Sequence, residues 1–311
     1  MEGRHRSRVS GLGHPTTGIR HPALLLVTRH LPLAALLITF HFSLATAFSA
    51  GRAESRAVQS KILGRSVRYT VLLPPSYDDQ RSRRYPILYF LHGLGDNEQS
   101  LLNGGWELVE PLQESGQIRE FLIVTPDGGR SFYINSRDGQ ERYEDFFIQE
   151  FIPAIEQRYR TTGTRSGRGI SGVSMGGYGA LRFAFRYPRL FVSVSAHMPA
   201  LEEQLPSGLI SSFGGALGAF GEPFDGQFWK QNTPFTLARE SRDLTSLSIY
   251  FDCGQQDDFG FDIGTQALHQ LLKERGVPHE FHLYPGRHNW QFVAAHFGES
   301  LRFHSRAFQK Q

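Results

Sequence analysis

The chain has almost no cysteine: Cys253 is the only one among its 311 residues. A single cysteine excludes an intrachain disulfide and a zinc site built from several cysteines. Cys253 ends an apolar run, which is typical of a small buried residue rather than of a reactive thiol. His279 and His282 are not a helical pair, and no third ligand accompanies them. We therefore expect no metal and no cofactor.

The main body of the chain also lacks a basic excess. The formal net charge is +3, but residues 1–47 hold five arginines and one glutamate, a net of +4, which leaves −1 for the remainder. Nucleic-acid binding depends on a basic surface, so this class of function is excluded. The composition is otherwise globular, since 40% of residues are hydrophobic and 20% are charged.

One apolar run is long enough to suggest a targeting segment. Residues 31–50 are almost free of charge, Arg29 precedes them, and residues 45–47 offer the small side chains that a signal peptidase requires. We predict that residues 1–47 are an export signal and that residues 48–311 are secreted or periplasmic, with no membrane span after cleavage. An uncleaved membrane anchor is the alternative, because the run approaches the length that spans a bilayer.

After this segment, short apolar runs alternate with helical patterns. Apolar residues recur at helical spacing over residues 143–159, 175–187 and 265–275. This alternation is typical of an α/β fold with a mostly parallel central sheet and helices on both faces. We see no internal repeat and no linker, so we predict a single domain over residues 48–311. The predicted strands are residues 66–73, 85–91, 121–125, 191–195, 247–251 and 281–284.

Residues 201–235 break this alternation. Glycines are interleaved with phenylalanine and tryptophan throughout the segment. Glycine loosens the backbone, whereas large aromatic side chains favour burial. The segment is therefore either a cap over a pocket or an ordinary surface excursion packed by its own side chains.

The strongest motif is Gly172-Val-Ser174-Met-Gly176, which follows an apolar stretch and opens a helical pattern. Glycines two residues before and after a serine allow the tight strand-to-helix turn that exposes its hydroxyl at the carboxyl end of a sheet. The N-terminus of the following helix directs free N–H groups at a developing oxyanion. No lysine follows, so the motif is not a phosphate-binding loop. We predict that Ser174 is a nucleophile.

A serine hydroxyl needs a base to remove its proton, and in this type of fold the base lies after the serine and an acid in the chain. His288 lies in a turn between the last predicted strand and the final helix. A turn at the carboxyl edge of the sheet can bring an imidazole to the serine, whereas strand and helix interiors cannot easily do so. We predict that His288 is the general base. The other histidines after residue 257 are His269, His279, His282, His296 and His304.

The acid that orients this imidazole is expected in the loop after the strand at residues 247–251. Asp257 is the first acidic residue of that loop, and it is the predicted partner of His288. Asp258 and Asp262 remain alternatives. Asp252 is less suitable because it still belongs to the strand.

The remaining parts of the site come from other loops. One oxyanion donor usually lies after an early central strand, here in the sequence His92-Gly-Leu94-Gly. We predict that the backbone N–H groups of Leu94 and Met175 are the two donors and that His92 shapes the loop. The residues predicted to line the substrate pocket are Trp106, Phe132 and Tyr133.

Six motifs, taken in order, resemble the esterase family of α/β-hydrolases. That family includes tributyrin-type esterases, S-formylglutathione hydrolases, feruloyl and acetyl xylan esterases, and mycolyltransferases. The resemblance covers residues 58–305 and implies an α/β-hydrolase fold with Ser174, Asp257 and His288 as its catalytic triad. The motifs are His92-Gly-Leu-Gly, Pro126-Asp-Gly-Gly, Arg142-Tyr-Glu-Asp, the Ser174 motif, Cys253-Gly-x-x-Asp and Gly286-x-His-x-Trp.

The resemblance is strongest to the tributyrin-type members, because of residues 127–135. An export signal argues against a cytosolic formylglutathione substrate. We expect a secreted serine esterase that hydrolyses a small-molecule or carbohydrate-linked ester through an acyl-enzyme on Ser174. An acyltransferase that uses the same triad and a sugar or other alcohol acceptor is the alternative. A non-enzymatic binding module is disfavoured because all three triad residues are present.

Overall fold

The structure is a computed structural model that describes residues 51–103 and 105–309. The predicted export signal at residues 1–47 lies outside the described residues. The described residues, 51–103 and 105–309, belong to one compact unit. No helix in the described part of the chain is both long enough and apolar enough to cross a bilayer.

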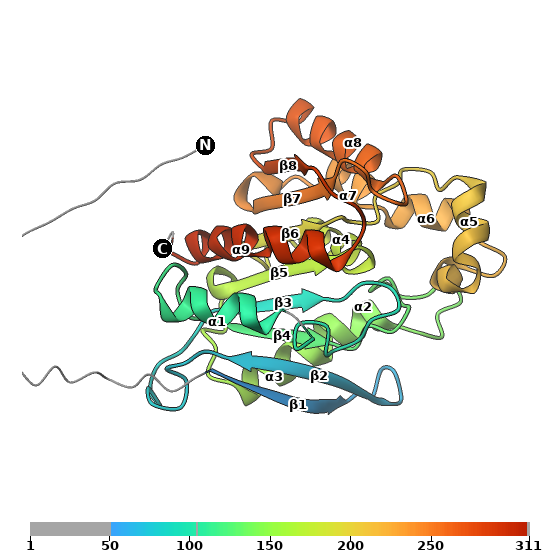
Figure 1. Ribbon diagram of the computed structural model, residues 1–311. Helices are drawn as coiled ribbons and strands as arrows, with labels where there is room; N and C mark the ends of the chain where they lie inside the picture. The colour runs from blue at the N-terminus through green and yellow to red at the C-terminus, as the bar shows by residue number, and fades with distance from the viewer. Residues whose placement is uncertain (1–50, 104, 310–311) are drawn as a thin grey trace, which may run out of the picture. The chain divides into compact units, whose positions relative to one another are not determined.

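Eight strands of the described chain form one sheet (Figure 1). The first two strands join it antiparallel, and the remaining pairs are parallel. The predicted α/β fold with a mostly parallel sheet is therefore confirmed. In spatial order the strands are β1 (Arg52–Gln59), β2 (Ser66–Leu73), β4 (Leu122–Pro126), β3 (Ile87–Leu91), β5 (Arg168–Val173), β6 (Ser193–His197), β7 (Ser248–Gly254) and β8 (Glu280–Tyr284).

The edge strand β1 was not predicted from the sequence. Most of its residues are exposed, and its few small apolar residues, Ala53, Ala57 and Val58, do not alternate regularly with polar ones, so they give no hydrophobic alternation. Arg52 and Arg56 both pair with Glu54 on this strand. Charged side chains of this kind protect an exposed sheet edge from pairing with another chain.

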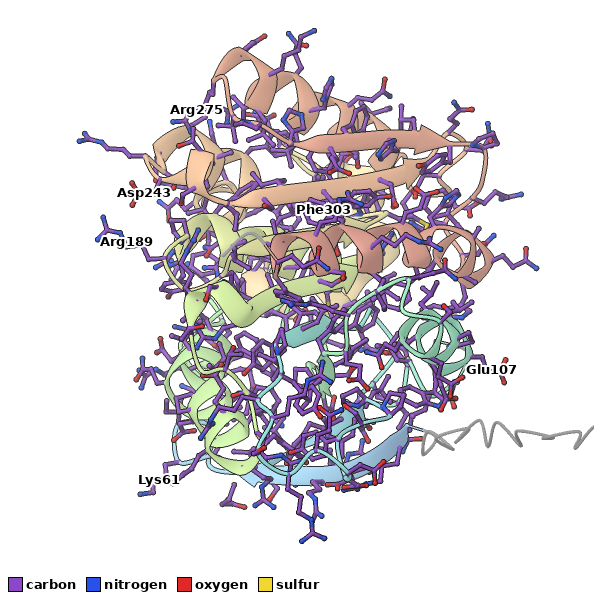
Figure 2. All side chains as sticks on the ribbon, turned by 90° about the vertical axis from the view of Figure 1, so that its left-hand side faces the viewer. Lys61, Glu107, Arg189, Asp243, Arg275 and Phe303 are labelled. Carbon is purple, nitrogen blue, oxygen red and sulfur yellow. The ribbon has the colours of Figure 1, made fainter. Side chains whose placement is uncertain are left out.

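Helices cover both faces of the sheet. The C-terminal helix α9 and helix α1 lie over one face, whereas α3 and α4 lie over the other (Figure 1). Charged side chains such as Lys61, Glu107 and Arg275 point outward (Figure 2). The α-helices are α1 (Trp106–Glu114), α2 (Tyr143–Phe146), α3 (Ile152–Arg158), α4 (Met175–Arg186), α5 (Ser207–Phe213), α6 (Gly226–Asn232), α7 (Pro234–Glu240), α8 (Phe261–Glu274) and α9 (Trp290–Ala307).

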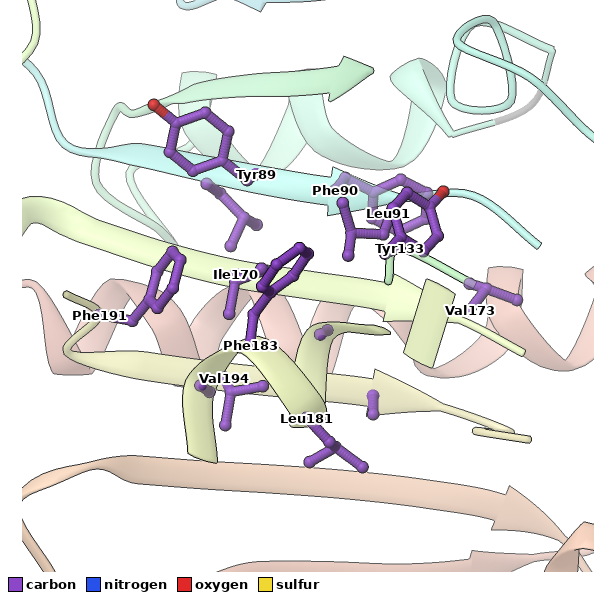
Figure 3. Packing of buried hydrophobic residues seen from close by; sticks show 14 of the residues in the cluster. Tyr89, Phe90, Leu91, Tyr133, Ile170, Val173, Leu181, Phe183, Phe191 and Val194 are labelled. Atoms are coloured by element: carbon purple, nitrogen blue, oxygen red, sulfur yellow. The ribbon is translucent and has the colours of Figure 1, made fainter. Parts of the chain in front are cut away.

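The helix predicted over residues 143–159 contains a π-helical turn, Phe147–Phe151, between α2 and α3. This turn places aromatic rings against the sheet and against α4. The ring of Phe147 stacks on Phe183 of α4, with centroids 4.6 Å apart, and contacts Tyr89 of β3 edge-on. Phe183 and its neighbour Leu181 pack beside the central strands in Figure 3. The buried core between α4 and the sheet therefore fixes the helix that begins directly after Ser174.

A buried ion pair joins α2 to the same helix. Glu144 contacts the Arg182 guanidinium at 2.7 Å and accepts a hydrogen bond from the Tyr187 hydroxyl at 2.7 Å. The side chains of Glu144 and Arg182 are only 4% and 2% exposed. Arg182 also donates to the Asn232 side chain at the end of α6. These contacts give Glu144 a structural role, because they join α2 to α4.

Removal of this carboxylate leaves the buried Arg182 charge without its partner. We expect Glu144→Ala to lower the free energy of unfolding by about 3–5 kcal/mol, because an unpaired buried charge is strongly destabilising. Glu141→Ala is the matched control, since its pair with Arg65 is exposed and worth at most about 1 kcal/mol. Urea unfolding followed by circular dichroism measures both variants. Equal midpoints for the two variants would contradict the importance of the buried pair.

Candidate functional site

The residues predicted for catalysis all follow strands of the parallel part of the sheet. Leu94 comes after β3, Ser174 directly after β5, Asp257 after β7 and His288 after β8. Parallel strands end at one edge of a sheet, so their loops meet there. The topology therefore brings together segments that lie far apart in the sequence.

Ser174 occupies a strained turn between β5 and α4. Its φ is +56°, a left-handed conformation that non-glycine residues rarely adopt. The two glycines of the motif are required by contact: a Cβ on Gly172 would lie 2.2 Å from the Gly176 carbonyl oxygen, and one on Gly176 would lie 1.9 Å from the Leu91 carbonyl oxygen. The Ser174 N–H donates to the His197 carbonyl at 2.9 Å. The turn is thus fixed by the close backbone contacts of the two glycines and by the hydrogen bond from the Ser174 N–H to the His197 carbonyl.

Ser174, His288 and Asp257 form one hydrogen-bonded path. The His288 Nε2 lies 2.9 Å from the Ser174 Oγ, and the His288 Nδ1 lies 2.7 Å from the Asp257 Oδ2. The Asp257 Oδ1 accepts the backbone N–H groups of Phe259 and Phe261 at 2.9 and 3.3 Å. The carboxylate is fully buried and the imidazole is 11% exposed. The arrangement can remove a proton from the serine and stabilise the resulting imidazolium.

The other acidic residues near this loop have different partners. Asp258 pairs with Arg287 and accepts the His288 backbone N–H at 3.1 Å. The Arg287 guanidinium lowers the pKa of Asp258 below its usual value. Asp252 lies in β7, where it is buried against the His197 imidazole at 2.9 Å. Asp262 belongs to the first turn of α8. The structure therefore places Asp257, and none of these three, against the His288 imidazole.

Backbone contacts hold the acid loop against the histidine loop. The N–H of Gln255 donates to the Tyr284 carbonyl, and the N–H of Gln256 donates to the Gly286 carbonyl. In return, the Gly286 N–H donates to the Gln256 side chain at 3.0 Å. Together with the Asp258–Arg287 pair, these bonds fix the distance between the two loops. The His288–Asp257 contact is thus set by several elements and not by one hydrogen bond.

Cys253 touches the same carboxylate. The buried thiol lies 3.5 Å from the Asp257 Oδ2, the oxygen that contacts His288. Burial, followed by the charge of Asp257, raises the pKa of the thiol. A thiol in this state is a weak nucleophile. The structure therefore agrees with the prediction that Cys253 is a buried, unreactive residue.

Two residues with free backbone N–H groups lie beside Ser174. Leu94 and Met175 both line a pocket with Ser174 and His288, and within the described part of the chain neither N–H has a hydrogen-bond partner. Free N–H groups beside a nucleophile can stabilise an oxyanion. The Leu94 loop comes very close to the serine, since a Cβ on Gly93 would lie 3.5 Å from the Ser174 Cβ.

Hydrogen bonds of His92 and Tyr133 hold the Leu94 loop in place. The His92 Nε2 accepts the Gly128 N–H at 2.8 Å, and the Tyr133 hydroxyl donates to the His92 carbonyl at 3.0 Å. Burial lowers the pKa of His92, which keeps the imidazole neutral and able to accept this hydrogen bond. These contacts agree with the predicted loop-shaping role of His92.

Two pockets open onto Ser174 and His288. The first has a volume of about 310 Å³, and we call it the aromatic pocket. The second has a volume of about 170 Å³, and we call it the small pocket. A larger hollow of about 670 Å³ lies beside the C-terminal end of α4, but no histidine or cysteine lines it. The side chains that give the aromatic pocket its character are Phe132, Phe213, Leu217, Trp229, Phe259 and Phe261. The small pocket has both apolar and polar side chains besides Ser174 and His288: Phe90, His92, Leu94, Asp96, Ser100, Val173, Met198, Asn289, Trp290 and Val293.

Of the three residues predicted to line the substrate pocket, Phe132 does so. Tyr133 does not, because its fully buried side chain turns to His92 and packs edge-on against Tyr143. Trp106 does not either, because it begins α1 and lies against Gly51, whose Cβ would come within 2.6 Å of the indole. Both residues are therefore corrections to the prediction.

Several side chains that line the aromatic pocket were not named individually in the prediction. Leu205, Phe213, Leu217 and Trp229 come from residues 201–235, so this segment forms one wall of the pocket. The interleaved aromatic residues of that segment were the available signal. Phe259, from the acid loop, contacts the His288 ring edge-on with centroids 4.8 Å apart.

In the described ranges, no group of three or more histidine, cysteine, aspartate or glutamate side chains is placed to hold a metal ion.

The fold and this arrangement define a serine hydrolase of the α/β-hydrolase class. The model of the esterase family matches residues 60–304, and the chain belongs to that family. Esterase MT1326 and Esterase Rv1288, both from Mycobacterium tuberculosis, are each 29% identical to it over 257 residues, which is 74% of this chain and 54% of theirs. The chain therefore spans about half the length of these curated relatives.

Solved structures agree with the fold. A ferulic acid esterase is 27% identical and superposes with a TM-score of 0.73, over 84% of this chain and 99% of its own. An S-formylglutathione hydrolase from Agrobacterium tumefaciens is 22% identical with a TM-score of 0.67, over 85% of this chain and 97% of its own. The second likeness shows the fold alone.

Proposed function

We propose that this chain hydrolyses carboxylic esters through an acyl-enzyme on Ser174. The observation that carries the proposal is the unbroken path from the Ser174 Oγ through the His288 imidazole to the buried Asp257 carboxylate, with distances of 2.9 and 2.7 Å. Membership in the esterase family supports the same reaction.

In the acylation step, the His288 Nε2 takes the hydroxyl proton while the Ser174 Oγ bonds to the ester carbonyl carbon. The imidazolium then gives this proton to the alcohol oxygen as the bond between carbonyl carbon and alcohol breaks. The alcohol leaves, and the acyl group stays on Ser174. Asp257 holds the imidazole in the tautomer that presents Nε2 to the serine.

In the deacylation step, His288 takes a proton from water, whose oxygen bonds to the acyl carbon. The proton returns to the Ser174 Oγ as the acyl–serine bond breaks, and the acid is released. In both steps the carbonyl oxygen becomes negatively charged. The free N–H groups of Leu94 and Met175 are the proposed donors to it, a contribution typically worth about 10²–10³ in kcat for each donor.

The aromatic pocket is the proposed site of the acyl group. Its walls are aromatic and aliphatic side chains, which favour contact with an apolar group. The structural neighbour described as a ferulic acid esterase supports an aromatic acyl group, and the volume also suits an aliphatic one. We therefore propose that the substrate carries an apolar acyl group.

The alternative function is acyl transfer to a sugar or another alcohol. The same acyl-enzyme serves both reactions, and an alcohol in the small pocket would replace water in the second step. A product that forms only when an acceptor alcohol is present, with a matching fall in free acid, would favour this alternative.

Substitution of Ser174 tests the proposed nucleophile. We expect the protein to cleave p-nitrophenyl acetate, butyrate and octanoate and Ser174→Ala to lose at least about a thousandfold in kcat, because no other group replaces the serine. Ser115→Ala, an exposed serine at the end of α1, is the control that keeps its rate. If parent and Ser174→Ala are folded but equally inert on all three esters, the proposal is wrong.

Substitution of Asp257 and of Asp258 separates the roles of the two neighbouring acids. We expect Asp257→Asn to lower kcat by about 10⁴, because the amide no longer holds the required imidazole tautomer. Asp258→Asn loses only an exposed ion pair and one backbone contact, so we expect a loss of tenfold or less. Steady-state kinetics with one p-nitrophenyl ester compares the two variants. If Asp258→Asn loses more activity than Asp257→Asn, the assignment of Asp257 as the orienting acid is wrong.

Export is proposed on the sequence alone. We propose that residues 1–47 direct secretion and are removed after Ala47; a start at Val27 would give a more compact signal. N-terminal sequencing of protein from the medium or periplasm is expected to begin at residue 48. Full-length protein held in the membrane fraction would favour the anchor, and peptides from residues 1–26 in the precursor would refute the start at Val27.

A further inference from the structure

The segment that follows β6 contacts the backbone of the nucleophile at two points. The His197 carbonyl accepts the Ser174 N–H at 2.9 Å, and the Ala200 N–H donates to the Ser174 carbonyl at 3.0 Å. Between these two contacts, Met198 has a left-handed φ of +44°, a strained conformation that persists only where the surroundings enforce it. The position of Ser174 therefore depends on what anchors residues 197–200.

The side chain of His197 anchors this segment to β7. The imidazole is fully buried, and its Nδ1 lies 3.0 and 2.9 Å from the two carboxylate oxygens of Asp252. The Asp252 Oδ2 also accepts the Tyr250 hydroxyl at 2.8 Å, and the Asp252 carbonyl accepts the Met198 N–H at 2.8 Å. Since β7 leads into the loop of Asp257, these contacts join the segment behind the nucleophile to the strand before the acid.

The other nitrogen of the same ring reaches the helix that follows His288. The His197 Nε2 lies 2.8 Å from the Ser300 Oγ of α9, and the Phe297 ring of that helix packs edge-on against the imidazole with centroids 5.8 Å apart. Asn289, the residue after His288, caps the first turn of α9 with its side chain. A shift of α9 therefore moves the His288 imidazole.

We propose that His197 is a positioning residue that sets the distance between the Ser174 Oγ and the His288 Nε2. It joins the three segments that carry the triad, and its side chain lines neither the aromatic pocket nor the small pocket. It therefore acts through Ser174, Asp257 and His288 and not on the substrate. The inference rests on the proposed ester hydrolysis at Ser174. Misplacement of reacting groups by about 1 Å can lower a rate about a hundredfold, so alignment of this kind is measurable in kcat.

Ser300→Ala is the first test, because it breaks the link to α9 and leaves His197 and Asp252 in place. We expect kcat on p-nitrophenyl butyrate to fall about tenfold and KM to change less than twofold. The reacting atoms lose their alignment, whereas both pockets keep their side chains. His197→Gln also disturbs the link to β7, and we expect it to lower kcat about a hundredfold.

The matched control is Ser193→Ala. Ser193 and His304 make a fully buried hydrogen bond of 2.7 Å that also joins β6 to α9, but at the start of the strand, away from Ser174. Each serine variant leaves one buried imidazole nitrogen without its partner, so we expect similar falls in the urea midpoint. The kcat of Ser193→Ala is expected to stay within twofold of the parent value.

The two pairs of variants decide between positioning and general stability. If Ser300→Ala and Ser193→Ala lower kcat to the same extent, or if Ser300→Ala leaves kcat unchanged, the proposal is overturned. His304→Gln is the control for His197→Gln and is expected to keep kcat within threefold. Should His197→Gln fail to fold, the comparison of the two serine variants still decides.

The proton between His288 and Asp257 gives a readout that does not depend on turnover. An imidazole N–H that donates to a carboxylate at 2.7 Å gives a resonance far downfield in the proton NMR spectrum. We expect Ser300→Ala to shift or broaden this resonance and Ser193→Ala to leave it in place. The same resonance in the parent and in Ser300→Ala contradicts the proposal. A shifted resonance in Ser300→Ala, with a parent that cleaves no ester, would instead count against ester hydrolysis alone.

Discussion

The turn at Ser174 brings backbone segments closer together than side chains would allow. The N-terminus of α4 packs so tightly on β3 that position 176 must be glycine. Position 172, in β5, must be glycine because a Cβ there would collide with the backbone of Gly176. Ser174 itself has a left-handed backbone conformation, which costs of order 1–3 kcal/mol. The strain persists because its N–H bonds to β6 and because the aromatic core around Phe183 holds α4 on the sheet. The exposed hydroxyl and the free Met175 N–H are both consequences of this one turn.

The second half of the site depends on neighbouring strands and not on a single motif. β7 and β8 run side by side, so the loops that follow them can exchange backbone hydrogen bonds before any side chain is considered. Asp258 and Arg287 add an ion pair across the same two loops. Asp257 is then buried against His288, with its other oxygen occupied by backbone N–H groups. This preorganisation leaves the carboxylate one geometry for contact with the imidazole.

The two pockets beside the nucleophile are built from different parts of the chain. Residues 201–235 supply an aromatic wall on one side, while the loops after β3 and β8 supply Asp96, Ser100 and Trp290 on the other. The buried pair of Glu144 and Arg182 ties α4 to α6 through Asn232, so the aromatic wall and the helix of the nucleophile share one support.

The sequence by itself determined the parts of this protein that are encoded locally. The alternation of apolar runs predicts the parallel strands, and the glycine spacing around Ser174 predicts its turn, because both depend on neighbouring residues. The order of strands, loops and candidate residues also led to His288 and Asp257. The tertiary structure decided the rest. Phe132 faces the aromatic pocket while the adjacent Tyr133 turns beneath the Leu94 loop, and Trp106 packs elsewhere, because each direction is set by packing partners distant in the chain. The strand β1 gave no signal of its own, since its place in the sheet is set by pairing with β2.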